Sequence, residues 1–198
     1  MNLKYIQAIG NLLENYYSDL NYISNFHRYK SGKISKNDYL KKSEGSFKNF
    51  INGYRIARNV KKAQTGQLLK LTIKWTKSNL KNDVDNFAAY LYKNGITRHE
   101  SSKSLASKIL FLNNPWDILP MDTLSRKAVN LNDNDYKKYK EKVEEFKHDR
   151  KSEINRYLNS INKQLTFIEK KFKNEIRNIN LIRKNRMIDK MLWSKGRQ

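Results

Sequence analysis

The sequence predicts an all-α protein, a single compact helical domain that ends in a long basic helix or helix pair. Three observations lead to this fold class. Apolar residues recur at spacings of three and four through most of the 198 residues. Residues that break helices are few, with seven Gly and two Pro in the whole chain. The stretch 136–193 contains neither of them.

The first helices can be placed from periodicity and from the residues that interrupt it. Residues 3–26 carry apolar side chains on one helical face, and the Ser-Gly-Lys sequence at 31–33 ends that pattern. A second helical segment is expected over 35–62. Ser35 suits its N-cap, because a serine hydroxyl accepts a backbone N–H bond there, although two glycines inside the segment weaken it.

The central helices are shorter. Residues 66–81 fit a helix. The alternation of Leu, Leu, Ile and Trp in this stretch also fits a strand, which is the alternative prediction. A helix over 82–93 should stop at Gly95, and an apolar-faced helix is expected over 101–112. After a loop bounded by the two prolines, a short helix is expected over about 123–130.

The last third of the chain is periodic and strongly basic. Its apolar positions between 154 and 182 recur at spacings close to a heptad, which predicts a structural seam that could also pair two chains as a homodimer. Residues 136–198 hold 19 Lys and Arg against 8 Asp and Glu, so this segment is either a solvated charged surface or a phosphate-contacting one. Along the sequence we therefore divide the chain into 1–80, 81–135 and 136–198.

Composition narrows the class of partner. The formal net charge of +22 favours a polyanion, with duplex DNA as the first expectation and RNA as an alternative. No stretch of about 18 apolar residues predicts a membrane span, so no membrane partner is expected and the cytoplasm is the expected compartment. The chain has no Cys and three scattered His, which gives no metal-ligand spacing, and we expect neither metal nor cofactor.

The loop between Pro115 and Pro120 is the best candidate for a reactive centre. It presents Asp122 immediately before a short helix, where either this residue or Thr123 could be the N-cap. Backbone N–H groups and the helix dipole favour an ionised carboxylate at such a place. An ionised carboxylate can stabilise a developing positive charge or orient a water, as cleavage of a glycosidic bond requires. The alternative is a plain helix cap.

The residues around this loop resemble the helix-hairpin-helix DNA glycosylase superfamily, and in particular divergent oxoguanine-glycosylase-like proteins. The resemblance lies in Pro120, Met121, Asp122, Thr123 and Arg126, with Leu124 where the family has His. It extends over about 80–198, and the closing stretch Arg186–Trp193 is similar to the last helix of these proteins. The resemblance implies that the Asp122 carboxylate is catalytic.

A catalytic lysine is also implied by the resemblance. Bifunctional members place it about 18 or 19 positions before the Asp, where Lys103 stands here, although the slot could fall on Ser104 and Lys108 lies further along. The family's glycine hairpin is missing. Residues 96–102 occupy its place, so phosphate contacts would have to come from side chains such as Arg98, Ser101 and Lys103.

The implied activity is excision of a damaged or modified base, from cellular or phage DNA, with or without strand scission at the resulting site. The base would be extruded into a pocket and stacked on aromatic residues. Substrate-binding candidates are Trp116, Trp193, Arg126, Lys127, Lys108 and Arg98. Two other functions compete: a non-enzymatic nucleic-acid-binding protein on a degenerate glycosylase-like fold, and an assembly subunit whose basic surface binds an acidic protein.

Overall fold

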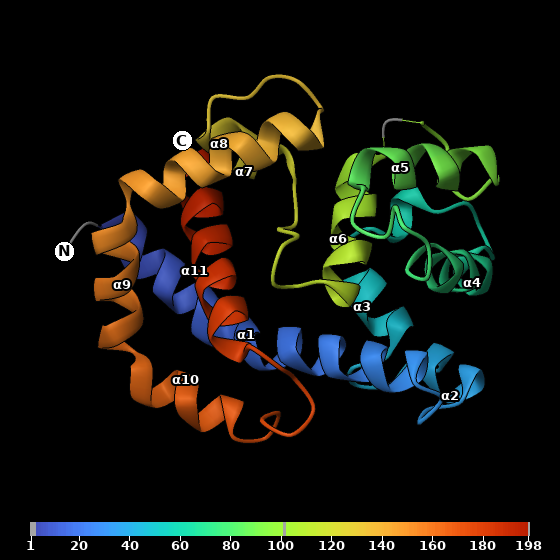
Figure 1. Cartoon of the computed structure of the whole chain (residues 1–198), viewed down its shortest axis with the longest axis horizontal. Coiled ribbons are helices and arrows are strands. Elements are labelled where there is room, and N and C mark those ends of the chain that lie inside the picture. Colours follow the sequence, from blue (N-terminus) through green and yellow to red (C-terminus); the bar gives the residue numbers. More distant parts are fainter. Residues whose placement is uncertain (1–2, 101, 198) are drawn as a thin grey trace. The chain divides into compact units, whose positions relative to one another are not determined.

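The computed structural model describes residues 3–100 and 102–197, without the side chains of Leu3 and Lys4. Over this part of the chain 67% of the structure is helical and no strand is formed, which confirms the all-α fold class (Figure 1). Val60 and Thr97 form an isolated antiparallel bridge. Within the described ranges, no helix is both long and apolar enough to cross a membrane.

The residues group into two compact units. Unit 1 comprises the residues up to Leu20 and those from Leu119 onward, and unit 2 comprises Asn21–Ile118. Helix α1 (Leu3–Lys30) begins in unit 1 and ends in unit 2.

Unit 2 consists of the end of α1 and short helices with well-defined caps. They are α2 (Lys36–Leu40), α3 (Phe47–Gly53), the 3-10 turn η1 (Ala57–Asn59), α4 (Thr65–Trp75), α5 (Val84–Lys93) and α6 (Lys103–Asn113). The Ser35 hydroxyl caps α2 by accepting the Asp38 N–H at 3.1 Å, as predicted. Asp83 caps α5 by accepting the Asn86 N–H at 2.9 Å, and the chain turns at Gly95 with a positive φ.

One long segment of unit 2 differs from the expectation. The helix predicted over 35–62 is divided into α2, α3 and η1. Gly45 adopts φ +72 at the first division, and a Cβ there would lie 2.1 Å from the Asn25 amide nitrogen. A residue that needs positive φ and close approach ends a helix, so the glycine acts as a turn and not as a weak helical position.

Unit 1 contains the first part of α1, the short helix α7 and four further helices. Their bounds are α7 (Thr123–Ala128), α8 (Tyr136–Asp149), α9 (Lys151–Ser160), α10 (Asn162–Glu169) and α11 (Ile179–Gly196). The long helix or helix pair predicted over 136–193 was therefore wrong, because the segment forms four helices. Arg150 and Ile161 leave helical geometry at the first two breaks, and Asn178 adopts φ +50 before α11.

The periodic apolar residues of 154–182 fill the core of unit 1. Seven of them are less than 10% exposed: Ile154, Leu158, Ile161, Leu165, Phe172, Ile176 and Ile182. The structural interpretation of the seam is therefore confirmed. Because the helices that carry these side chains turn at the breaks, the seam is not a continuous exposed stripe, and these residues are buried within one chain.

Candidate functional site

Asp122 is the N-cap of α7 and takes part in a reciprocal capping box. The Ser125 N–H donates to Asp122 Oδ1 at 2.8 Å, and the Asp122 N–H donates to the Ser125 hydroxyl oxygen at 2.8 Å. Two backbone donors at the start of the helix are thereby satisfied. Of the two N-cap residues considered, Asp122 fills the position, and Thr123 is the first helical residue.

The turn before Asp122 is held by two buried tyrosines of α8. The Tyr136 hydroxyl accepts from the Leu119 N–H and donates to the Leu119 carbonyl, both at 3.0 Å. The Tyr139 hydroxyl donates to the Pro120 carbonyl at 3.3 Å. Three main-chain groups of this non-helical turn are therefore paired with side-chain hydroxyls, which fixes the direction in which α7 starts.

Helix α7 packs tightly against the end of α11. A Cβ built on Gly196 would lie 1.9 Å from the Leu124 carbonyl oxygen. No L side chain can approach a backbone this closely, so Gly196 allows the two helices to touch. This contact places Asp122 beside the polar residues of α11.

Those polar residues form a buried charged cluster. Arg186 is 1% exposed and donates from Nε to Asp19 Oδ2 at 2.7 Å and from a terminal nitrogen to Asp189 Oδ2 at 3.0 Å. Burial raises the pKa of the Asp189 carboxyl, although the charges of Arg186 and Lys190 oppose this. Burial also lowers the pKa of the Lys190 amine, and the charge of Arg186 acts in the same direction. The Asp122 charge acts on both groups, raising each pKa.

The lysine implied by the resemblance is engaged elsewhere. Lys103 Nζ lies 2.7 Å from Asp85 Oδ1, with both side chains partly exposed. Lys103 and Asp85 belong to unit 2, whereas Asp122 belongs to unit 1. Lys108 donates to the Tyr54 carbonyl at 3.5 Å within unit 2, while Arg98 is exposed and Ser101 lies outside the described residues.

The remaining substrate-binding candidates are also divided between the two units. In unit 1, Arg126 donates to the Asn132 carbonyl at 2.8 Å and so fixes the loop after α7, while Lys127 is exposed. Trp193 has the Arg197 guanidinium 3.6 Å from its ring centroid. In unit 2, Trp116 is half-buried with its ring 5.8 Å from that of His27. Neither tryptophan is fully in the core.

A second feature lies in unit 2, and composition along the chain indicates it more clearly than any motif. Residues 45–82 contain nine Lys and Arg and no Asp or Glu. The lysine patch, defined as Lys30, Lys77 and Lys81, belongs partly to this stretch, and all three residues are exposed. Partial burial of the ammonium lowers the pKa of Lys30, and the charges of Lys81 and Lys77 lower it further, so both residues lie within electrostatic range of Lys30.

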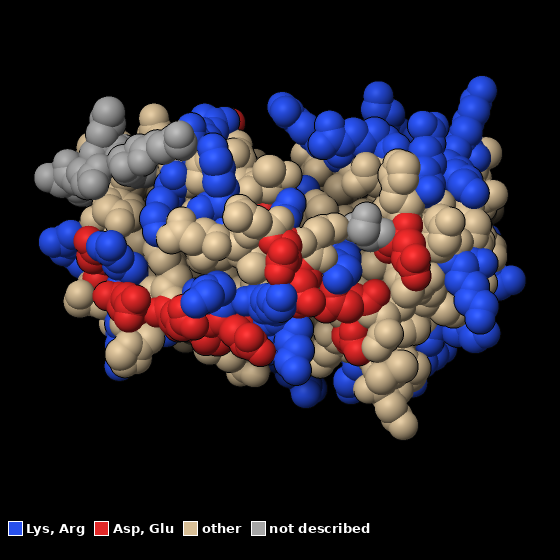
Figure 2. Space-filling view, turned by 90° about the horizontal axis from the view of Figure 1, so that it is seen from above, with Lys and Arg blue, Asp and Glu red and all other residues tan. Residues whose placement is uncertain are grey.

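Like charges repel one another, and among the residues that the structure describes no ion pair joins a carboxylate to Lys30, Lys77 or Lys81. The Lys30 ammonium donates to the Asn113 side-chain oxygen at 2.7 Å, which orients it without neutralising it. Helix α4 adds Lys70 and Lys74, one turn apart and exposed. On the face in Figure 2, Lys and Arg side chains project widely and acidic side chains gather in places.

Unit 1 also contains a pocket of about 290 Å³ that does not include Asp122. It is lined by Tyr5, Phe146, Arg150, Glu153, Arg156, Tyr157, Met191 and Lys195. Sequence reasoning did not find it, because its residues come from four helices that no motif connects. Among the described residues, no group of three His, Cys, Asp or Glu side chains could hold a metal ion.

The arrangement offers two kinds of chemistry. A carboxylate beside an amine whose pKa is lowered could act on a sugar, and exposed cations without carboxylates could hold phosphates. No family model matches the chain, and no curated protein or solved structure gives a significant match to it.

Proposed function

We propose that this protein binds nucleic acid, duplex DNA in the first place, through the exposed cations of unit 2. The observation that carries the proposal is the run of nine Lys and Arg without an acidic residue over 45–82, together with the lysine patch. A surface that only needed solubility would mix both signs of charge. Phosphates can neutralise the clustered ammonium groups and release the counterions bound to the nucleic acid.

The affinity for duplex DNA should therefore fall steeply with salt. Each neutralised phosphate contributes about −0.9 to the slope of log K against log salt concentration. The triple variant Lys30→Gln/Lys77→Gln/Lys81→Gln should bind at least about tenfold more weakly, with a slope shallower by up to about three. Fluorescence anisotropy with a labelled duplex across a salt series measures both quantities.

A matched control is Lys163→Gln/Lys170→Gln/Lys173→Gln, which removes the same charge from exposed positions of unit 1. Its affinity should stay much nearer that of the wild type. Equal losses in the two triple variants would mean that only net charge matters, and an affinity independent of salt would contradict nucleic-acid binding itself. A single-stranded RNA and an acidic protein tested in parallel distinguish the alternative partners.

We also propose, as a second candidate, that the bound DNA is a substrate for base excision with Asp122 as the residue that stabilises charge at the sugar. The supporting observation is the location of Asp122, on a turn anchored by Tyr136 and Tyr139 and within electrostatic reach of Lys190. The resemblance to DNA glycosylases points to the same residue.

The variant Asp122→Asn separates the two roles of this residue. Asn caps helices about as well as Asp, so folding and DNA binding should stay near the wild-type level. Excision of modified bases should fall by about a hundredfold or more, because the negative charge is lost. The measurement is release of bases from damaged and modified duplexes. Wild-type excision by this variant would reduce Asp122 to a cap.

Lys103→Gln tests the implied nucleophile. If water displaces the base and the Lys103 amine then condenses with the aldehyde of the abasic site, base excision should be kept in this variant while strand scission is lost. If the Lys103 amine itself displaces the base, both activities should be lost. Lys190→Gln is the matched comparison, because Lys190 lies in the same unit as Asp122 and its pKa is lowered. Borohydride traps the Schiff base between an enzyme amine and the sugar as a stable protein–DNA adduct. Loss of this adduct in Lys190→Gln, but not in Lys103→Gln, would identify the Lys190 amine on α11 as the nucleophile.

A further inference from the structure

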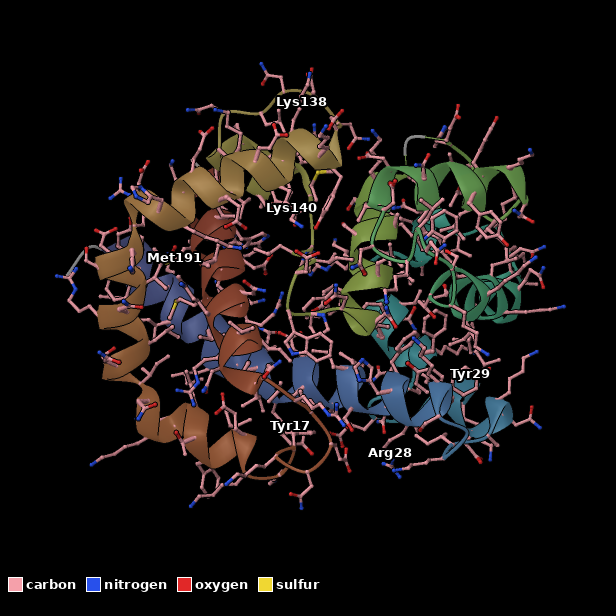
Figure 3. All side chains as sticks on the ribbon, in the orientation of Figure 1. Tyr17, Arg28, Tyr29, Lys138, Lys140 and Met191 are labelled. Atoms are coloured by element: carbon pink, nitrogen blue, oxygen red, sulfur yellow. The ribbon has the colours of Figure 1, made fainter. Side chains whose placement is uncertain are left out.

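The pocket of unit 1 combines an aromatic floor with a cationic rim. Phe146, Tyr157 and Met191 form the floor and are each less than 10% exposed. Figure 3 shows Met191 directed from α11 toward α9, the helix that carries Tyr157. The volume of about 290 Å³ lies at the lower end of the range for small-ligand sites, roughly 300–1,000 Å³.

The cations of the rim are positioned by the rings beneath them. The Arg156 guanidinium lies 5.1 Å from the centroid of the Tyr157 ring, and its nitrogen donates to the Tyr157 hydroxyl at 3.1 Å. The Lys195 ammonium lies 5.6 Å from the centroid of the Phe146 ring. Cation–π attraction holds such groups near one geometry, so less side-chain entropy is lost when they bind an anion.

One acidic residue organises the rim. Glu153 Oε2 accepts from the Arg150 guanidinium at 3.1 Å. Burial raises the pKa of Tyr5, and the charge of Glu153 and a hydrogen bond to it act in the same direction. Tyr5 in turn stacks on Tyr157, with ring centroids 5.0 Å apart. The rim keeps an excess of positive charge, because Arg156 and Lys195 remain in addition to the Arg150–Glu153 pair.

We propose that this pocket binds a single nucleotide, with the base beside Tyr5, Phe146 and Met191 and the phosphate at Arg156 and Lys195. A planar aromatic group and an anion within one small ligand match a floor of rings and sulfur with cations at its edge. The inference does not depend on the lysine patch, which lies in the other unit. The nucleotide can be free or the terminal unit of a strand, and both sources offer the same chemistry.

Isothermal titration calorimetry tests the pocket with the full chain and four probes: adenosine monophosphate, adenosine, inorganic phosphate and a short single strand with a 5′ phosphate. The monophosphate should bind at least about tenfold more tightly than adenosine or phosphate alone, because it uses the floor and the rim together. Equal binding of phosphate and monophosphate would overturn the proposal, since only an anion site would remain. Failure of both the monophosphate and the strand to bind would also overturn it.

The rim variant Arg156→Gln/Lys195→Gln should weaken the monophosphate by about tenfold or more for each cation removed. The matched control Lys151→Gln/Lys163→Gln removes the same charge from exposed residues outside the pocket and should leave the affinity unchanged. The variant Tyr5→Leu changes the pocket ring that stacks on Tyr157 and leaves the buried floor intact, so it should weaken binding of the monophosphate but not of inorganic phosphate. Unchanged binding in both pocket variants would overturn the assignment.

The strand arm identifies the source of the nucleotide. If the rim variant binds the phosphorylated strand more weakly than the wild type does, the pocket is a site for a strand end. If only its affinity for the monophosphate falls, the pocket is a site for a free nucleotide. Either result supports the pocket. The triple variant of the lysine patch should leave monophosphate binding intact, so failure of nucleic-acid binding in unit 2 can be told apart from failure here.

Discussion

Replacing Arg186 by Met should lower the free energy of unfolding by about 3–5 kcal/mol. The Arg186 guanidinium is almost fully buried and bonds the carboxylates of Asp19 on α1 and Asp189 on α11. Met keeps much of the volume but removes the charge, which leaves two carboxylates in a poorly solvated place without their cation. Urea denaturation of the variant and the wild type, followed by circular dichroism, measures the difference.

Two further variants test the cause of this loss. Lys173→Met changes an exposed residue of the same unit and should stay within about 0.5 kcal/mol of the wild type. Asp19→Asn combined with Arg186→Met removes one of the stranded charges and should recover part of the lost stability. If Arg186→Met unfolds at the wild-type urea concentration, the cluster does not hold α1 on α11.

The fold class could be predicted because most helices are signalled locally. Ser35 caps a helix where the sequence indicates, and the chain turns at Gly95 just after α5, as predicted. At these positions the residue type, the hydrogen bond and the periodicity agree, which makes the interpretation independent of the rest of the chain.

The breaks in the last third could not be predicted by the same reasoning. Nothing in the stretch 136–193 forbids one continuous helix, since Arg150 and Ile161 are ordinary helix residues. They leave helical geometry so that apolar side chains on successive helices can share one core, with Ile154 and Leu165 fully buried. Burial of this kind outweighs helix propensities of a few tenths of a kcal/mol.

The candidate site was only partly accessible from the sequence. An N-cap at Asp122 or Thr123 follows from their position before a short helix, and the capping box with Ser125 assigns it to Asp122. The pairing of Lys103 with Asp85 does not follow from any spacing, because it depends on how α5 and α6 pack. The environment of Lys190 could not be predicted from the sequence either, since the groups that shift its pKa come from α1, α11 and the N-cap of α7.

Three buried tyrosines should make the protein unfold in alkali. Burial raises the pKa of Tyr16, Tyr39 and Tyr139, and the Tyr16 hydroxyl also donates to Glu169 Oε1 at 2.6 Å. Each tyrosine therefore stays protonated when folded but ionises near pH 10 when unfolded. Their contribution to stability is complete below about pH 10 and is lost as the pH rises above it, by about 1.4 kcal/mol per pH unit for each tyrosine.

Lys190 changes the dependence of stability on pH in the opposite direction from the tyrosines. Because its folded pKa is lowered, stability rises with pH until the unfolded lysine loses its proton near pH 10.5. The net loss should therefore steepen above about pH 10.5, where the three tyrosines together contribute a slope approaching about 4 kcal/mol per pH unit. Circular dichroism and tyrosinate absorbance, recorded together against pH, should show unfolding and ionisation in one step.

The variant Tyr16→Phe tests this account at a single hydroxyl. It removes one ionisable group and leaves Glu169 paired with Arg183, so the fold should survive at neutral pH. The loss of stability above pH 10 should become shallower by about 1.4 kcal/mol per pH unit. Tyr92→Phe, which changes a tyrosine that is 46% exposed, should leave the slope as it is. Buried tyrosines that ionise well before the helices unfold would show that water reaches them in the folded chain, and the alkaline transition would then need another cause.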